Sequence, residues 1–217
     1  MTPAIVLRTV DYGESDRVVT LLSREEGKLS AIARGARKSK RRFGAALSLF
    51  GVGEARLSER AGAELATLES FSSARGFPGL YADVAKVAHG SYACELVREL
   101  SPPRHAEPAL FDLLLGFLAL LDEGEARAET LRVLELHALD AVGLRPDFDQ
   151  CAVFADLPGE ARQALEQAQA LSLAEAQAFV LAPAVNAACR DALSKFILDH
   201  LGRPLKSVEF IAKLNHA

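Results

Sequence analysis

The most prominent chemical feature of the sequence is a run of basic residues near the N-terminus, here called the basic run. Between Arg34 and Arg42, six of nine residues are Lys or Arg and none is acidic. Guanidinium and ammonium groups at this density can neutralise successive phosphates of a nucleic acid without reading its bases. The candidate DNA-binding residues are therefore the six cations of this run: Arg34, Arg37, Lys38, Lys40, Arg41 and Arg42.

Other interpretations of the basic run remain open at this stage. Runs of like charge are often only solvated loops, and similar stretches serve as anionic-lipid patches or nuclear addresses. The charge distribution favours nucleic acid, because residues 1–45 carry a net charge of +5 while the rest of the chain carries −9. Tyr12, Phe43 and Phe50 are candidate base-stacking residues, with a place in the core as the alternative for Phe50.

Motifs for catalysis are missing from the sequence. Gly51-Val52-Gly53 lacks the third glycine of a dinucleotide fingerprint, and neither a P-loop nor a Gly-x-Ser-x-Gly elbow is present. No two of the five histidines have the His-x-x-x-His spacing of a helical metal pair, so we expect them at the surface or in helix caps. We therefore expect no enzyme and no cofactor, and a hydrolase or transferase is disfavoured.

The three cysteines also argue against a metal site. Cys94 and Cys189 fall within apolar helical stretches and are expected to be small buried hydrophobes. Cys151 lies in an irregular loop, but Phe154 stands where a Cys-x-x-Cys pair needs its second thiolate. Widely spaced cysteines, odd in number, likewise give no disulfide framework, which fits a reducing compartment.

Composition indicates an ordinary globular protein. The chain has 217 residues, of which 50% are hydrophobic and 25% are charged. Its longest apolar run, Leu113–Leu121, is nine residues long, whereas a membrane-spanning helix needs about twenty. The first residues lack the features of a signal peptide. We expect no membrane association and a cytoplasmic location.

The N-terminal third has the pattern of short strands separated by turns. Glycine and short polar residues interrupt stretches that are rich in Val, Ile, Leu and Thr. Five strands in about 70 residues predict a small barrel or sandwich over residues 1–76, with the basic run between the third and fourth strands. The expected strands are Ala4–Thr9, Arg17–Ser23, Lys28–Arg34, Leu47–Leu57 and Glu64–Phe71.

After Phe77-Pro78-Gly79 the hydrophobic spacing is helical. Gly143 and Gly202 are expected as helix C-terminal glycines, and Ser172 with Glu175 forms a predicted capping box. Residues 80–217 are therefore predicted to be an all-α domain, which makes the whole chain α+β. The expected helices are Leu80–Leu100, Leu110–Leu121, Thr130–Val142, Glu160–Leu171, a short one opened by Ser172, Ala184–Leu201 and Val208–Leu214.

Segments at both ends of the chain resemble one known family. The sequence resembles the bacterial recombination mediator RecO family, in the right order and at about the right separation. The matching segments are Ala4-Ile5-Val6-Leu7-Arg8, Tyr12-Gly13-Glu14-Ser15-Asp16-Arg17, Gly27-Lys28-Leu29-Ser30, Gly35-Ala36-Arg37 and His200-Leu201-Gly202-Arg203-Pro204-Leu205-Lys206-Ser207.

The resemblance implies an N-terminal five-stranded OB-fold barrel followed by a helical domain. It also implies a non-enzymatic, nucleoid-associated protein that binds single- and double-stranded DNA and anneals complementary strands. With RecR, such a protein helps RecA replace single-stranded DNA-binding protein. It further implies contact with the acidic C-terminal tail of single-stranded DNA-binding protein, for which a hydrophobic groove rimmed by Lys or Arg would be suited.

The sequence departs from the family in its helical part. Many RecO proteins carry a four-cysteine zinc module there. Asp149-Gln150-Cys151 matches the start of that module, but Phe154 replaces the second cysteine and Cys189 stands alone. We therefore expect the zinc module to be degenerate or absent.

A second class of function remains as the alternative. The chain could be a non-catalytic protein-interaction scaffold, with its acidic helical half as the main contact surface and its basic run bound to an acidic partner tail. DNA-binding affinity that depends on salt would distinguish the mediator from this scaffold.

Overall fold

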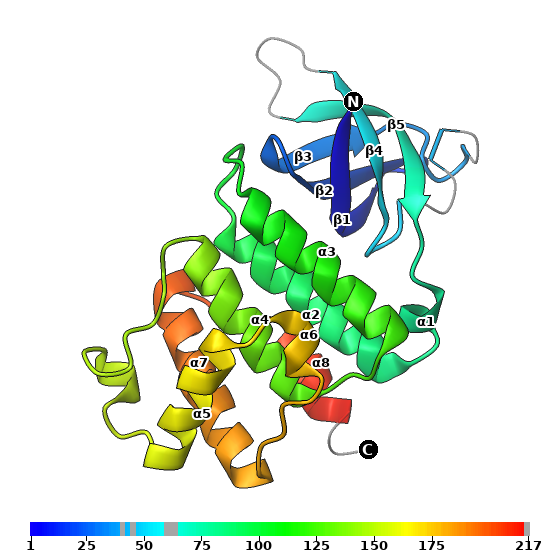
Figure 1. Cartoon of the computed structure of the whole chain (residues 1–217). Helices are drawn as coiled ribbons and strands as arrows, with labels where there is room; N and C mark the ends of the chain where they lie inside the picture. The colour runs from blue at the N-terminus through cyan, green and yellow to red at the C-terminus, as the bar shows by residue number, and fades with distance from the viewer. Residues whose placement is uncertain (40–41, 44–46, 59–64, 215–217) are drawn as a thin grey trace. The chain divides into compact units, whose positions relative to one another are not determined.

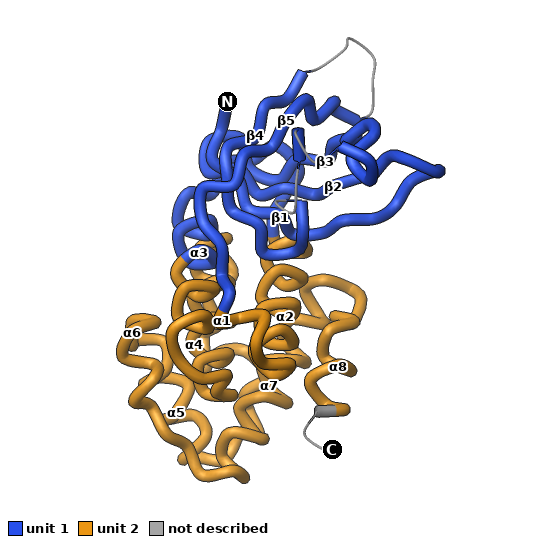
Figure 2. The backbone as a smooth tube through the Cα atoms, turned by 90° about the vertical axis from the view of Figure 1, so that its right-hand side faces the viewer, with its two compact units in different colours: residues 1–78, 101–115 blue, residues 79–100, 116–217 orange. Residues whose placement is uncertain are grey.

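The computed structural model describes residues 1–39, 42–43, 47–58 and 65–214 (Figure 1). They belong to two compact units, which are drawn in different colours in Figure 2. The first unit comprises residues 1–78 and 101–115, and the second comprises residues 79–100 and 116–217. The strands lie in the first unit and most of the helices in the second. The domain boundaries expected from sequence, 1–76 and 80–217, stay a prediction.

The first unit is built on a closed five-stranded barrel. The strands follow one another around it in the order β1-β2-β3-β5-β4, which is the OB-fold order. β3 and β5 run parallel, and the other neighbouring pairs are antiparallel. The OB-fold prediction is therefore confirmed. The strands are β1 (Thr2–Tyr12), β2 (Asp16–Ser23), β3 (Gly27–Ala33), β4 (Val52–Ser58) and β5 (Ala66–Arg75).

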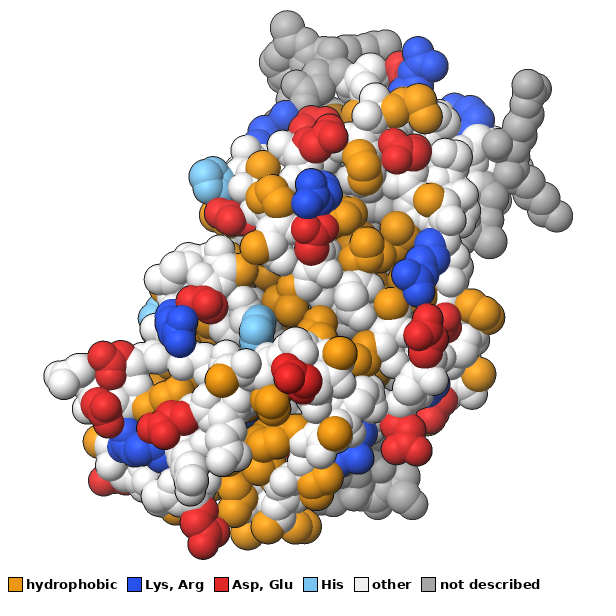
Figure 3. Space-filling model, in the orientation of Figure 1, with side chains coloured by type: hydrophobic (Ala, Val, Ile, Leu, Met, Phe, Trp, Pro, Cys, Tyr) orange, Lys and Arg blue, Asp and Glu red, His pale blue; other side chains and the backbone are white. Residues whose placement is uncertain are grey.

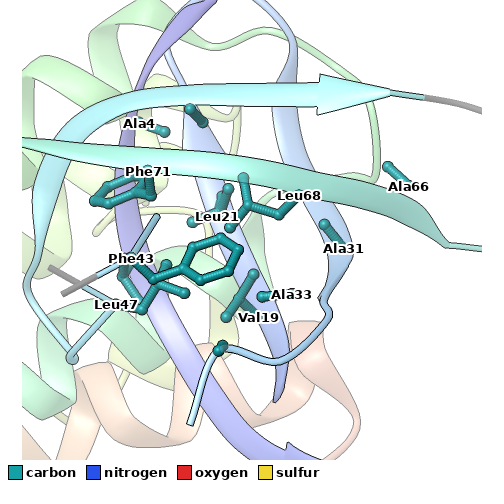
Figure 4. Packing of buried hydrophobic residues seen from close by; sticks show 13 residues of the cluster. Ala4, Val19, Leu21, Ala31, Ala33, Phe43, Leu47, Ala66, Leu68 and Phe71 are labelled. Atoms are coloured by element: carbon teal, nitrogen blue, oxygen red, sulfur yellow. The ribbon is translucent and has the colours of Figure 1, made fainter. Parts of the chain in front are cut away.

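Large and small apolar side chains fill the barrel together (Figure 4). Alternate residues of the strands point inward, as the two-residue period of a strand requires. Many of them are alanines, which leave room for the larger rings of Phe43 and Phe71. Phe43 and Leu47 come from the segment between β3 and β4 rather than from a strand, and they are 2% and 1% exposed. These two residues are therefore part of the barrel core.

The predicted strand Leu47–Leu57 is wrong in its first half, because residues 47–50 form turns and β4 begins only at Val52. Phe50 has a positive φ of 69°, although it is not a glycine. Burial of its ring and two backbone hydrogen bonds hold this conformation: Phe50 N donates to Val6 O, and Val6 N to Gly51 O. Packing against β1 therefore overrides the alternating sequence pattern. β5 extends beyond its predicted end, to Arg75.

Residues 101–115 pack on the barrel within the first unit. The backbone N–H of Arg104 donates to the carbonyl of Lys28 at 3.0 Å. Gly27, with a φ of 71°, lies so close that a Cβ atom there would stand 2.0 Å from the carbonyl oxygen of His105. Only glycine fits both the backbone conformation and the contact.

The second unit is a helical array in which α4 contacts α2, α5, α6 and α7. The helices are α1 (Pro78–Tyr81), α2 (Val84–Leu100), α3 (Pro108–Glu123), α4 (Ala128–Ala141), α5 (Gly159–Ala170), α6 (Leu173–Ala176), α7 (Pro183–Leu201) and α8 (Ser207–Leu214), with a 3-10 turn η1 (Ala152–Phe154).

The predicted helix Leu80–Leu100 is interrupted between α1 and α2, at Ala82 and Asp83. The carboxylate of Asp83 accepts a hydrogen bond from the backbone N–H of Ala85 at 2.7 Å, so a local side-chain bond starts a new helix there.

The predicted helix ends are confirmed. Gly143 and Gly202 have positive φ angles of 75° and 68°. The side chains and backbones of Ser172 and Glu175 form the expected capping box. Within the described residues, no helix is both long enough and apolar enough to cross a membrane.

Candidate nucleic-acid interface

The basic run leaves the barrel at the end of β3, and its residues Arg34 to Lys38 form turns. Arg34, Arg37, Lys38 and Arg42 all have exposed side chains. Lys40 and Arg41, which also belong to the predicted site, lie outside the described residues. The run lies between β3 and β4, as predicted.

The turn that holds Arg37 is bonded to the tip of the β1–β2 hairpin. The backbone N–H of Arg37 donates to the carbonyl of Ser15 at 3.0 Å. The Nη1 atom of Arg37 donates to the carbonyls of Gly13 and Glu14, at 3.4 and 3.3 Å. These bonds fix the position of a cation that is still 41% exposed.

Asp16 makes a second connection between the same two turns. Its Oδ1 atom accepts hydrogen bonds from the backbone N–H of Gly35 and from the hydroxyl of Ser15, both at 2.8 Å. These two bonds, helped by the positive charge of Arg34, hold the pKa of Asp16 below its ordinary value. The carboxylate therefore stays ionised and continues to accept both hydrogen bonds.

Arg42 connects the far end of the basic run to the barrel. Its Nη2 atom donates to the carbonyl of Arg34 at 2.8 Å, and its own carbonyl accepts the N–H of Phe71 in β5 at 3.0 Å. The guanidinium lies 5.1 Å from the ring centroid of Phe43, a cation–π distance. Arg34 and Arg42 are thus brought together in space, and their cationic groups remain exposed to an anion.

The three candidate stacking residues have different positions. Phe43 and Phe50 are buried in the barrel unit, so the stacking prediction is wrong for Phe43, and for Phe50 the alternative of a place in the core is confirmed. Tyr12 is 60% exposed at the end of β1. Sequence reasoning missed Arg17, whose Nε atom lies 3.0 Å from Asp11, a residue that also pairs with Arg37 at 3.6 Å. The short turn between β1 and β2 was the available signal, because it places residues 11 and 17 opposite each other.

A buried polar network lies in the helical unit. Glu135 accepts hydrogen bonds from the hydroxyl of Tyr92 at 2.5 Å and from Arg132 at 2.8 Å, and all three side chains are buried. His89 is only 7% exposed, which corrects the expectation that it lies at the surface. Its burial and the nearby charge of Arg132 lower its pKa to about 4.

Two adjoining cavities open in the helical unit, and they share Tyr92, Ser194 and Val208. The larger, about 580 Å³, includes the polar network. The smaller, about 300 Å³, is walled mainly by apolar side chains of α7 and of the residues that follow it, among them Leu198 and Leu205. Lys195 and Arg203 also line it. This smaller cavity is here called the apolar groove.

Two of the three cysteines lie in the protein interior. Cys94 and Cys189 are buried as predicted, and burial raises the pKa of the Cys94 thiol to about 12. Among the described residues, no group of three His, Cys, Asp or Glu side chains is placed to hold a metal ion.

On the face shown in Figure 3, acidic and basic side chains are interspersed rather than separated into large patches.

Comparison with known proteins identifies the family to which this architecture belongs. The family model described as Recombination protein O N terminal matches residues 1–77, and the one described as Recombination protein O C terminal matches residues 81–156. A DNA repair protein RecO from Anaeromyxobacter sp. (strain K) is 42% identical, with 97% of this chain and 94% of the relative covered. The DNA repair protein RecO of Myxococcus xanthus is 40% identical, over 97% of this chain and 96% of the relative.

The family models match the barrel and part of the helical unit, which assigns the chain to a class of two-part proteins of DNA repair and recombination. Within that class, the chain belongs to the RecO family.

Proposed function

We propose that this protein binds DNA through the basic run and acts as a recombination mediator. The observation that supports this most directly is the cluster of exposed cations, Arg34, Arg37, Lys38 and Arg42, on turns that are bonded to the barrel. Fixed cations bind phosphates with less loss of side-chain entropy than free ones. Binding of this kind is strong at low salt and largely independent of sequence.

The mediator activity that we propose is non-enzymatic. Cationic side chains reduce the phosphate repulsion between two complementary strands and hold them near each other, which promotes annealing. Together with RecR, the protein would help RecA load onto single-stranded DNA that is covered by single-stranded DNA-binding protein.

A variant of the basic run tests DNA binding. In it Arg37, Lys38, Lys40, Arg41 and Arg42 are replaced by Ala, and affinity for a single-stranded oligonucleotide is titrated at several salt concentrations. If all five contact phosphates, the slope of log affinity against log salt falls by about 3.5, from about 0.7 per contact. A control with Lys at the three Arg positions keeps the charge and should keep most of the slope. Unchanged affinity and slope in the Ala variant would contradict the proposal.

The apolar groove supports a second proposed contact, with the acidic C-terminal tail of single-stranded DNA-binding protein. Its apolar wall suits the hydrophobic side chains of such a tail, and Lys195 and Arg203 suit its carboxylates. Arg203 is already paired with Glu99, but its side chain is 68% exposed. A tail carboxylate can therefore still approach this guanidinium.

Peptide binding tests this contact. A fluorescent peptide with the sequence of the acidic tail is titrated with the unaltered protein and with variants Lys195→Glu and Leu198→Asp. Each variant is expected to weaken binding about tenfold or more, because one reverses a charge and the other places a carboxylate in an apolar wall. Val180→Asp, at a residue that is 69% exposed and does not line the groove, is the control. Equal affinity in all four proteins would contradict the assignment.

A further inference from the structure

Tyr12 differs from the other aromatic residues described in the barrel unit. Its side chain is 60% exposed, whereas the five phenylalanines of that unit are all at most 3% exposed. Val10, two residues earlier on the same face of β1, is also 42% exposed. An apolar ring and an apolar neighbour are thus presented to solvent at the tip of the β1–β2 hairpin.

The backbone on both sides of Tyr12 is firmly held. Asp11 and Tyr12 pair with Arg17 and Asp16 across the hairpin. The carbonyl of Gly13, the next residue, accepts a hydrogen bond from Arg37. The aromatic ring and a phosphate-binding cation are therefore parts of one bonded structure, so little entropy is lost when both contact the same ligand.

The acidic residues of the hairpin do not prevent an anionic ligand from binding. The carboxylate of Asp11 is paired with Arg17 and Arg37, and that of Asp16 accepts bonds from Gly35 and Ser15. Glu14 is exposed and repels phosphate. Phosphates are therefore expected near Arg37, and the exposed ring of Tyr12 remains accessible to a base.

We propose that Tyr12, with Val10 beside it, is a base-stacking platform that makes the interface prefer unpaired nucleotides over duplex DNA. The inference rests on the proposed DNA binding and adds the kind of DNA that is preferred. An unpaired base can place its face on an aromatic ring, whereas in a duplex that face is covered by neighbouring bases. Basic residues alone neutralise phosphates of either form and give no such preference.

The variant Tyr12→Ala tests the proposal. Binding of single-stranded and duplex oligonucleotides of equal length is titrated at one fixed salt concentration. The variant is expected to lose about tenfold in affinity for the single strand and to keep its affinity for the duplex. The salt slope should be unchanged, because no phosphate contact is removed. Tyr12→Phe, which keeps the ring, should bind like the unaltered protein, as should Tyr81→Ala, a half-exposed tyrosine of the other unit.

A direct measurement of stacking is available because the chain contains no tryptophan. In the variant Tyr12→Trp, selective excitation of indole reports only on this position. Its fluorescence should be quenched by a single-stranded oligonucleotide and should change little with a duplex.

Several outcomes separate this inference from the proposed function. If the unaltered protein binds neither DNA, both proposals fall. If it binds DNA but Tyr12→Ala keeps its full single-strand affinity, only the stacking platform is wrong. Loss of RecR binding in Tyr12→Ala, with DNA binding intact, would instead make this patch a protein interface and would also overturn the proposal.

Discussion

The guanidinium of Arg24, in the turn after β2, makes two parallel hydrogen bonds to the carboxylate of Asp112 in α3, at 3.0 and 2.9 Å. The two residues are 88 positions apart in the chain, and both belong to the first unit. Their hydrogen bonds raise the pKa of Arg24 and lower that of Asp112. Because both side chains are about half exposed, solvent screens this pair. We therefore expect the tighter contact nearby, at Gly27, to matter more for stability.

Gly27→Ala should destabilise the barrel unit strongly. A left-handed backbone costs a residue with a Cβ about 1–2 kcal/mol, and the new methyl group would also collide with the carbonyl of His105. Gly13→Ala is a matched control, because Gly13 has a φ of 59° and a methyl group added there would meet no neighbouring atom within 4 Å. Urea unfolding should show a clearly larger loss for Gly27→Ala. Equal losses would mean that the contact with His105 does not constrain the barrel.

Glu135→Ala should be among the most damaging single changes in the helical unit. It leaves the guanidinium of Arg132, whose side chain is 5% exposed, without its carboxylate partner. Removing one partner of a buried ion pair lowers the free energy of unfolding by about 3–5 kcal/mol. The double variant Arg132→Met with Glu135→Leu removes both charges and should recover much of that loss in urea unfolding. A double variant no more stable than the single one would show that the pair is needed for packing rather than for charge.

Acid should destabilise the protein through His89. Its folded-state pKa of about 4 is lower than the ordinary value of 6.5, so between these two pH values the unfolded chain binds a proton that the folded protein does not. The contribution of His89 to stability is complete above pH 6.5 and decreases as the pH falls toward 4, by about 3 kcal/mol in total. Burial is the main cause of the lowered pKa of His89. The positive charge of Arg132 lowers this pKa further, and the negative charge of Asp83 raises it.

Unfolding free energies measured from about pH 7.5 to about pH 4.5 test this effect. The variant His89→Gln cannot bind the proton and should lose less stability over this range than the unaltered protein. Parallel curves for the two proteins would show that His89 is not the group responsible.

Phe154 occupies an aromatic cluster at the position where many RecO proteins have a cysteine of their zinc module. Its ring centroid lies 5.1 Å from that of Phe148 and 5.5 Å from that of Phe196, and its side chain is fully buried. Phe154→Ala should therefore lower the free energy of unfolding by about 3–5 kcal/mol.

Adding a chelator to the unaltered protein should change neither its helical circular dichroism nor its melting temperature. Stoichiometric zinc in the purified protein, with loss of helix on chelation, would contradict this expectation.

The sequence predicted the elements whose signals are local. Strand alternation outside residues 47–50, capping residues and C-terminal glycines such as Gly143 depend on neighbours in the chain, and these predictions hold. The errors at Phe50 and His89 arise from tertiary contacts. Phe50 is turned by bonds to β1, and His89 is buried because α2 packs against α4 and α8. Both contacts join residues that are far apart in the chain, so the spacing of neighbouring residues does not predict them.

In the candidate site, too, the features that depend on local sequence could be predicted and those that depend on tertiary contacts could not. The cations could be identified from their density in the sequence, and Tyr12 was among the candidate stacking residues. The fixing of Arg37 by hairpin carbonyls could not be foreseen, because no periodicity reports how two turns meet in space. The same is true of Phe43, which is close to the charges in sequence yet packs inside the barrel.

The burial of Phe43 and Leu47 also limits how the basic run can be studied by protein engineering. A deletion between β3 and β4 that includes these two residues would remove side chains that close the inside of the barrel. Such a shortened protein would expose its interior to water, so any failure to bind DNA would report damage to the fold rather than the missing charges. Point substitutions at the exposed cations avoid this confusion, because they leave Phe43 and Leu47 in place.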